Sequence, residues 1–165
     1  MLTIRNATIT DIPLIRGLTM QVWPQTYTPI IGKEQVAYML DRFYTPESLA
    51  AQMEEQRHTF IIGYLDNSPV AFAAYSQIAP GVFKLHKLYI ITGCQGKGVG
   101  RQMVDYIGGA IKTAGATELQ LNVNIHNSPA LIFYKKAGFT RLRDEDIDIG
   151  SGYFMNDHVL TLKIQ

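Results

Sequence analysis

The chain of 165 residues has the length of one domain, and its 47% hydrophobic content is ordinary for a globular protein. Its 15 basic and 14 acidic residues leave a net charge of +1, so no overall field favours nucleic acid or an anionic membrane. We therefore expect neither as a partner, and we predict a single domain over residues 1–165.

Cysteine use and hydropathy favour the cytoplasm. Cys94 is the single cysteine and cannot form an internal disulfide, and the opening Met-Leu-Thr-Ile-Arg lacks the apolar stretch of a signal peptide. No uninterrupted apolar run approaches the roughly 20 residues that span a bilayer. We expect a cytoplasmic protein.

The predicted elements begin with a strand over residues 2–5. Thr10 has the features of an N-cap, and the helix after it should stop near Pro24. Residues 23–31, with two prolines, are expected to form a loop. The remaining elements are predicted in the order helix 33–43, helix 46–56 after a Thr45 cap, strand 59–65, strand 70–77, strand 82–91, helix 99–114, strand 118–123, helix 128–137 and strand 153–164.

Antiparallel hairpins around a strand–helix–strand unit predict an α/β fold, with a mixed sheet and helices on both faces. The strongest functional motif lies between strand 82–91 and helix 99–114, and reads Gln95-Gly96-Lys97-Gly98-Val99-Gly100-Arg101. Three alternate glycines leave backbone N–H groups unobstructed, and the helix N-terminus adds about half a positive charge. We interpret the segment as a phosphate cradle; a plain tight turn is the alternative.

The residues around the three glycines exclude one class of phosphate-binding site and disfavour another. A Walker A loop is excluded, because no Gly-Lys pair is followed by Ser or Thr. A dinucleotide site would need an acidic residue about 20 positions after the glycines, where Glu118 lies. Glu118 opens its strand instead of closing it, and the loop does not follow the first strand, so the dinucleotide interpretation is disfavoured.

The glycine segment, placed after a strand that ends in Leu88-Tyr89-Ile90, resembles the signature of the GNAT superfamily of N-acetyltransferases. Further matches follow in register: Leu121-Asn122-Val123, then Asn127, Phe133-Tyr134 and Gly138-Phe139. The resemblance spans nearly the whole chain. It implies the acyl-CoA N-acyltransferase fold, with a mostly antiparallel sheet of six to seven strands.

The resemblance also implies acetyl-CoA as co-substrate and no metal. Backbone of the first strand at Leu88 and Ile90 would pair with the pantothenate arm, and the glycine segment would hold the pyrophosphate. The cofactor-binding residues that the resemblance implies are Leu88, Tyr89, Ile90, Gln95, Gly96, Lys97, Gly98, Val99, Gly100, Arg101, Asn127, Phe133, Tyr134 and Lys136. For Lys97, Arg101 and Lys136, a solvated surface cation is the alternative.

The implied reaction is direct attack of a primary amine on the acetyl carbonyl. The backbone N–H of Ile90 would polarise the carbonyl, and Tyr134 stands at the family's general-acid position. Asn122 occupies a position where some relatives carry Glu, and an amide cannot accept the proton. His86 is the candidate base, because its reference pKa near 6.5 suits the task, with ordered water as the alternative.

Aromatic residues indicate the acceptor side. Trp23 and Tyr27 lie in the first variable segment, and Tyr153 and Phe154 lie in the second, at about 149–157; these four are the predicted substrate-binding residues, with simple packing as the alternative. Both segments faintly resemble the bacterial branch that acetylates polyamines such as spermidine and spermine. The acidic run 144–148 would attract a polycation or form a solvated loop.

We therefore predict an acetyl-CoA-dependent N-acetyltransferase, with a small-molecule amine, such as a polyamine, as the favoured acceptor. A protein N-terminal or lysine acetyltransferase is the alternative, and a non-catalytic acyl-CoA-binding module is a remote one. A homodimer is an expectation from the family alone.

Overall fold

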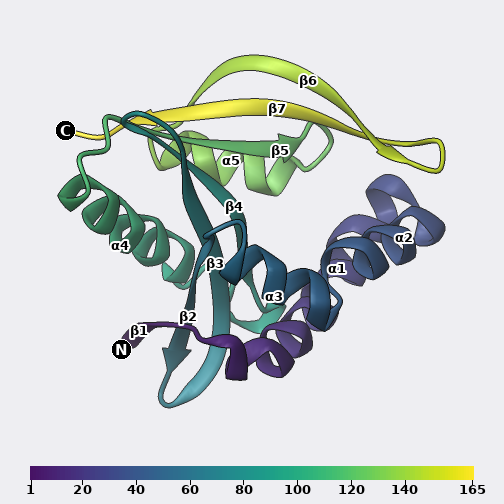
Figure 1. Ribbon diagram of the computed structural model, residues 1–165, viewed down its shortest axis with the longest axis horizontal. Helices are drawn as coiled ribbons and strands as arrows, with labels where there is room; N and C mark the ends of the chain where they lie inside the picture. Colours follow the sequence, from purple (N-terminus) through teal and green to yellow (C-terminus); the bar gives the residue numbers. More distant parts are fainter. The chain divides into compact units, whose positions relative to one another are not determined.

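The computed structural model describes residues 1–165, and it has the predicted mixed α/β fold (Figure 1). The helices, including two short 3₁₀ turns, are η1 (Ile9–Asp11), α1 (Ile12–Ile31), α2 (Lys33–Phe43), α3 (Pro46–Glu54), η2 (Thr92–Cys94), α4 (Val99–Thr113) and α5 (Ser128–Lys136). The strands are β1 (Leu2–Asn6), β2 (Thr59–Leu65), β3 (Ser68–Ala79), β4 (Val82–Ile90), β5 (Glu118–Asn124), β6 (Thr140–Gly150) and β7 (Tyr153–Lys163).

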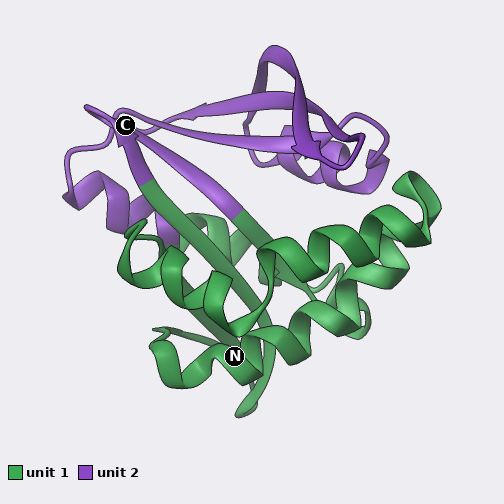
Figure 2. Ribbon diagram, turned by 45° about the vertical axis from the view of Figure 1, so that its right-hand side comes forward, with its two compact units in different colours: residues 1–76, 87–106 green, residues 77–86, 107–165 purple.

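The seven strands form one hydrogen-bonded sheet in the order β1-β2-β3-β4-β5-β7-β6. Its pairs include antiparallel β1–β2, β2–β3, β5–β7 and β6–β7, whereas β4 and β5 run parallel. The contacts group the chain into two compact units, Met1–Ser76 with Lys87–Tyr106 (unit 1) and Gln77–His86 with Ile107–Gln165 (unit 2), coloured separately in Figure 2. The single domain stays a prediction.

Both faces of the sheet in unit 1 are covered by helices, as predicted. Consecutive residues of β2, from Phe60 to Ile62, are buried, so neither face of this strand is left to solvent. On one face, Phe72 of β3 contacts Tyr89, which in turn contacts Trp23 of α1. On the other face, Gly63 of β2 lies against Met103 of α4.

The absence of a side chain at Gly63 allows this close approach of α4, the helix that begins at the glycine segment. A Cβ at Gly63 would lie 3.0 Å from the Met103 sulfur and 3.4 Å from Leu2 Cδ1. Gly63 therefore helps to position the start of α4 against the sheet.

Gly63→Val is expected to lower the free energy of unfolding by about 2 kcal/mol, because a Cβ and two methyl groups enter a filled space. Urea unfolding measures the change. Gly17→Val is the matched control, since no atom lies within 4 Å of a Cβ added at exposed Gly17, and its effect should stay below about 0.5 kcal/mol. Equal losses in the two variants would contradict this packing role.

The prediction that the first helix stops near Pro24 is wrong: α1 continues through Pro24 and Pro29 to Ile31. A proline inside a helix costs about 3 kcal/mol, so other contacts must stabilise this segment. The rings of Trp23 and Tyr27 supply such contacts, with centroids 4.4 Å apart and both within 6.4 Å of the Tyr89 ring. The segment 23–31 is thus helix and not the predicted loop.

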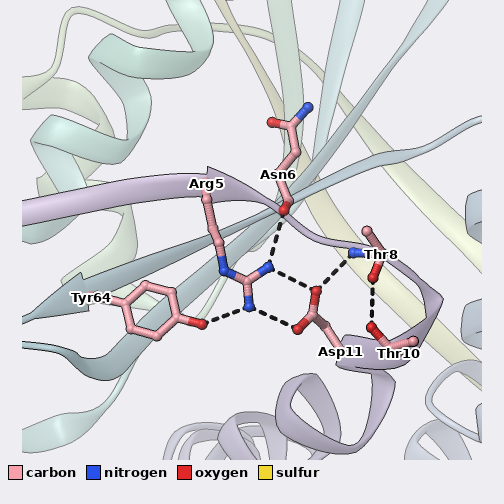
Figure 3. A network of polar contacts seen from close by, with 6 residues as sticks. All are labelled: Arg5, Asn6, Thr8, Thr10, Asp11 and Tyr64. Atoms are coloured by element: carbon pink, nitrogen blue, oxygen red, sulfur yellow. Dashed lines mark hydrogen bonds and ion pairs between the residues drawn. The ribbon is translucent and has the colours of Figure 1, made fainter.

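The predicted N-cap is also misplaced. Thr10 lies inside the 3₁₀ turn η1, and its hydroxyl group hydrogen-bonds to that of Thr8 (Figure 3). The N-cap of this turn is Thr8, and Asp11 completes a capping box, its carboxylate accepting a hydrogen bond from the Thr8 backbone N–H at 2.8 Å. The same carboxylate accepts two bonds from the Arg5 guanidinium, which also donates to the Tyr64 hydroxyl. This network joins β1, β2 and the start of α1.

Asp11→Asn is expected to lower Tm by about 3 °C at pH 7, since it removes the ion pair of a capping carboxylate. Hydrogen bonding by Arg5 lowers the pKa of Asp11 from 3.8 to about 2. The folded-state pKa is depressed, so the stabilisation is complete above about pH 4 and is lost as pH falls toward 2. Thermal unfolding from pH 7 to pH 2.5 should show the gap between the two proteins closing below pH 4; a constant gap would contradict this account.

In unit 2, β5 lies between β4 and β7, and its residues alternate strictly between buried and half-buried. One face is apolar: Leu119 and Leu121 of β5 pair with Leu162 and Leu160 of β7. The chain leaving α5 packs on this face, because a Cβ at Gly138 would lie 3.2 Å from Leu162 Cδ1. The opposite face carries polar side chains.

The acidic run 144–148 lies in strand β6. A solvated loop was one of the two roles predicted for it. No strand was predicted for residues 140–150. β6 is the edge strand of the sheet, where charged side chains are tolerated because one side faces solvent. Arg141 pairs with Asp144, and Arg143 with Glu145, so local ion pairs offset the charge.

The other predicted elements are confirmed to within three residues at their ends. No helix has the length and apolar character needed to cross a bilayer.

Candidate functional site

The glycine segment has an open conformation in unit 1. Gly96 and Gly98 have φ of +80° and +78°, which glycine adopts without strain. No atom lies within 4 Å of a Cβ added at Gly96, and only the Gln102 side chain approaches one added at Gly98, at 4.0 Å. These glycines are therefore required by backbone conformation, and the space above them is free for a ligand.

The backbone donors of this segment are also available. No N–H group from Gly96 to Arg101 donates to another backbone group, and those at the start of α4 have no partner within the helix. The Gln95 side chain donates to the Ile90 carbonyl at 3.1 Å, which ties the segment to the end of β4. Lys97 is exposed, and Arg101 bonds only Asp105 on the same helix. The segment thus has the open backbone that an anion cradle requires, and its ligand stays a prediction.

The parallel pairing of β4 with β5 covers only the first part of each strand. The parallel pairing runs from Val82 opposite Glu118 to Leu85 opposite Leu121 and ends there. His86 and Asn122 do not continue it. Leu88, Tyr89 and Ile90 follow on β4, all half-buried.

Two predicted acceptor residues, Trp23 and Tyr27, lie with Tyr89 and Tyr44 in an aromatic cluster of unit 1. Trp23 is 4% exposed, so its ring packs in the core. Trp23 Nε1 is buried and has no hydrogen-bond partner of good geometry. It lies near the Tyr44 hydroxyl group and lowers the pKa of Tyr44, against the larger opposite effect of burial. Burial raises the pKa of Tyr44 and of Tyr89, so both phenols are neutral at physiological pH.

The other predicted acceptor residues lie in unit 2 at the start of β7. Tyr153 is half-buried and Phe154 is 48% exposed. Adjacent residues of a strand point to opposite faces, so these two rings do not line the same surface.

Helix α5 of unit 2 carries the remaining predicted residues. Asn127 is buried and caps the helix, its Oδ1 accepting from the Ala130 N–H at 3.4 Å. Tyr134 is buried, with its ring edge-on to those of Phe133 and Phe139, at 5.1 and 5.4 Å. Lys136 is exposed in the last turn.

A sequence model of the acetyltransferase (GNAT) family matches residues 20–139, which include the glycine segment and most of α5. The chain belongs to the GNAT family of acetyltransferases. It is 31% identical to the peptidyl-lysine N-acetyltransferase YjaB of Escherichia coli K12 over 116 residues, 66% of this chain and 76% of that protein.

Solved structures show the same GNAT fold. The PaiA N-acetyltransferase of Thermoplasma acidophilum, solved in complex with coenzyme A, has a TM-score of 0.84 at 23% identity, covering 99% of both chains. The ribosomal-protein-S18-alanine N-acetyltransferase of E. coli has a TM-score of 0.74 at 18% identity, over 100% of this chain and 95% of that one. The predicted fold and the predicted enzyme class, a GNAT acetyltransferase, are thus confirmed.

The GNAT chain also has a polar cluster that the sequence did not predict, on the polar face of unit 2. His86 and Lys84 of β4 share this face by alternation, and Asn122 of β5 lies on it. Asn122 Nδ2 donates to Glu145 Oε1 at 3.1 Å and to Asp157 Oδ2 at 3.3 Å. Asp157 and Glu145 are therefore candidate functional residues. The only sequence signal for Asp157 is its position two residues before the apolar Val159, because residues two apart on a strand share a face.

Proposed function

We propose that this GNAT enzyme transfers the acetyl group of acetyl-CoA to a primary amine by direct attack. The observation that carries the proposal is the open glycine segment at the start of α4, with positive φ at Gly96 and Gly98 and unpaired N–H groups up to Arg101. Such a segment fits a pyrophosphate, the charged group of coenzyme A. The PaiA structure holds coenzyme A on the same fold.

The remaining coenzyme contacts follow the family pattern. The backbone of Leu88, Tyr89 and Ile90 pairs with the pantetheine arm, supported by the end of the β4–β5 pairing at Leu85. Gln95, Lys97 and Arg101 add side-chain donors around the pyrophosphate. Together with Gly96, Gly98, Val99 and Gly100, these residues make up the proposed binding segment.

In unit 2, three residues stand at further positions of the family's coenzyme pattern. Asn127 uses Oδ1 to cap α5 and has its Nδ2 for the pantetheine arm. Phe133 lines the thiol end, and Lys136, exposed on the last turn, is available to the adenosine side.

Tyr134 is the proposed acid for the departing thiolate. Its burial between Phe133 and Phe139 fixes the ring, which an acid in the transition state requires. The reference pKa values are about 10 for a phenol and about 8.5 for a thiol, so proton transfer is slightly uphill. Tyr134 therefore serves as much by hydrogen-bonding the thiolate as by protonating it. The Ile90 N–H polarises the carbonyl. For the proton acceptor, the sequence indicates His86 as one candidate and ordered water as another.

For the acceptor, a small-molecule amine such as a polyamine is the first candidate; the half-buried rings of Tyr27 in unit 1 and Tyr153 in unit 2 are each suited to contact an ammonium group. Trp23 supports Tyr27 from the core, and exposed Phe154 is available at the β7 end. The lysine ε-amino group is the second candidate, favoured by the 31% identity to an E. coli peptidyl-lysine N-acetyltransferase.

A thiol-release assay tests the proposal, with acetyl-CoA and matched panels of polyamines, amino acids, aminoglycosides and lysine peptides. Turnover on small amines alone supports the first acceptor, and turnover on lysine peptides alone supports the second. Acetyl-CoA binding without turnover on any panel would instead favour the non-catalytic acyl-CoA-binding module.

A further inference from the structure

The carboxyl group of Asp157 is the most deeply buried acidic side chain of the polar face in unit 2. The residue is 7% exposed and lies on β7 opposite Asn124. One of its oxygens, Oδ2, accepts a hydrogen bond from Asn122, and the other, Oδ1, accepts none. Oδ1 is not one of the fully buried atoms that lack a partner, so this oxygen has solvent access and is open to a ligand.

The charges around Asp157 come from three strands. Lys84 reaches it from β4, Glu145 from β6, and His158 is its neighbour on β7. Burial raises the pKa of Asp157, and Glu145 adds to the rise, while Asn122, Lys84 and His158 oppose it. The net direction is upward, which brings the carboxylate closer to the range where a general base works well near neutral pH.

The position of the cluster fits a role in acetyl transfer. Asn122 is the first residue of β5 beyond the last β4–β5 pair, so Asp157 is held at the point where the two strands part. The polar face that carries Asp157 is opposite the apolar face on which the chain leaving α5 packs. Groups that serve the incoming amine and the departing thiolate need separate approaches to the acetyl group, and the two faces supply them.

We propose that Asp157 is the proton acceptor for the amine substrate, with Asn122 as its positioning residue. The inference rests on the proposed N-acetyltransferase function. Asp157 takes a proton from the ammonium group: the N–H bond breaks, an O–H bond forms on the carboxylate, and the nitrogen keeps the electron pair. That pair then forms the bond to the acetyl carbon as the carbon–sulfur bond breaks and the thiolate of coenzyme A leaves. The acetylated nitrogen, which still carries one extra proton, loses it to solvent and becomes the neutral amide. Asp157 later releases its proton to water.

The test compares kcat/KM against pH for wild type and Asp157→Asn on the best acceptor of the panel. Asp157→Asn should reduce kcat/KM at pH 7 about 10²- to 10³-fold, recover activity as rising pH supplies neutral amine, and leave KM for acetyl-CoA within about threefold. Asp144→Asn is the matched control, because this exposed carboxylate of the same hairpin pairs with Arg141 and His158. It should stay within about twofold of wild type.

Two further variants separate a chemical role from a structural one. Asn122→Ala removes a hydrogen bond that lowers the pKa of Asp157, so the acidic limb of the profile should move to higher pH, which a merely structural contact would not cause. His86→Gln should keep the acidic limb.

The outcomes distinguish a failure of the role proposed for Asp157 from a failure of the proposed acetyltransferase function. Wild-type pH profiles in both Asp157→Asn and Asn122→Ala would overturn the role of Asp157 while leaving the acetyltransferase intact. Loss of the acidic limb in His86→Gln would assign the proton to His86. A wild type that binds acetyl-CoA but acetylates no amine would contradict the proposed function itself, and this role with it. Should Asp157→Asn fail to fold, the Asn122→Ala limb decides.

Discussion

Tyr134→Phe is expected to lower kcat about 10²-fold and to leave KM for acetyl-CoA within about threefold. The substitution removes only the hydroxyl group, while the ring contacts with Phe133 and Phe139 that hold α5 in place are retained. Loss of a positioned acid typically costs 10²- to 10⁴-fold, and a tyrosine whose proton transfer is slightly uphill belongs at the lower end of that range. Steady-state thiol release measures both parameters.

Tyr106→Phe is the matched control for this variant. Tyr106 lies on α4 and is 41% exposed, so the loss of its hydroxyl group should leave kcat within about twofold. A Tyr134→Phe enzyme with wild-type kcat would show that the hydroxyl group has no role in the reaction and that Tyr134 serves only through its ring contacts with Phe133 and Phe139.

Gly98→Val is expected to weaken acetyl-CoA binding about 30-fold or more. A β-branched residue at φ +78° is strained by about 1–3 kcal/mol, and relief of that strain turns the backbone N–H groups away from the ligand. The new side chain also occupies the open space above the segment, where the pyrophosphate is proposed to lie. Calorimetric titration with acetyl-CoA or coenzyme A gives the Kd directly.

Gly115→Val separates ligand binding from general strain. Gly115 has φ of +88°, ends α4 at the helix terminus far along the chain from the glycine segment, and has no atom within 4 Å of an added Cβ. This variant should lose stability similarly but bind acetyl-CoA with unchanged Kd. If the two variants weakened binding equally, the effect at Gly98 would come from destabilisation and not from the cradle.

The sequence predicted the elements whose signals are local. Thr45 caps α3 as predicted, its hydroxyl oxygen accepting a hydrogen bond from the Ser48 N–H. Gly115 and Gly138, which follow α4 and α5, have positive φ. The glycine segment was predicted for the same reason: its conformation depends on the residues within it. Likewise, the Asp66-Asn67 reversal of the first hairpin has both residues at positive φ.

The predictions that failed depend on contacts distant in sequence. Pro24 is a local stop signal, yet the rings of Trp23, Tyr27 and Tyr89 hold the helix beyond it. Strand β6 has no alternating apolar pattern, because its edge position allows charges that pair along it and with β7. Local propensity cannot show either effect.

The candidate site likewise has one part that is local in sequence and another that depends on contacts distant in sequence. The coenzyme segment is contiguous in sequence, whereas Asn122, Glu145 and Asp157 meet only through the pairing of β5, β6 and β7. From the sequence, His86 was therefore the candidate base, and Asp157, a buried carboxylate 35 residues from its hydrogen-bond partner Asn122, was not predicted. Such a group is visible only when strand register is known.

The central claim is that this GNAT protein moves an acetyl group from acetyl-CoA onto an amine nitrogen. Incubation with acetyl-CoA that carries an isotope-labelled acetyl group, followed by mass spectrometry of the amine panel, tests it most directly. The predicted result is one labelled N-acetyl group per molecule of free coenzyme A released, on one class of amine, with the yield strongly reduced in Tyr134→Phe. Release of coenzyme A without any labelled amine, or bound acetyl-CoA that never reacts, would contradict it.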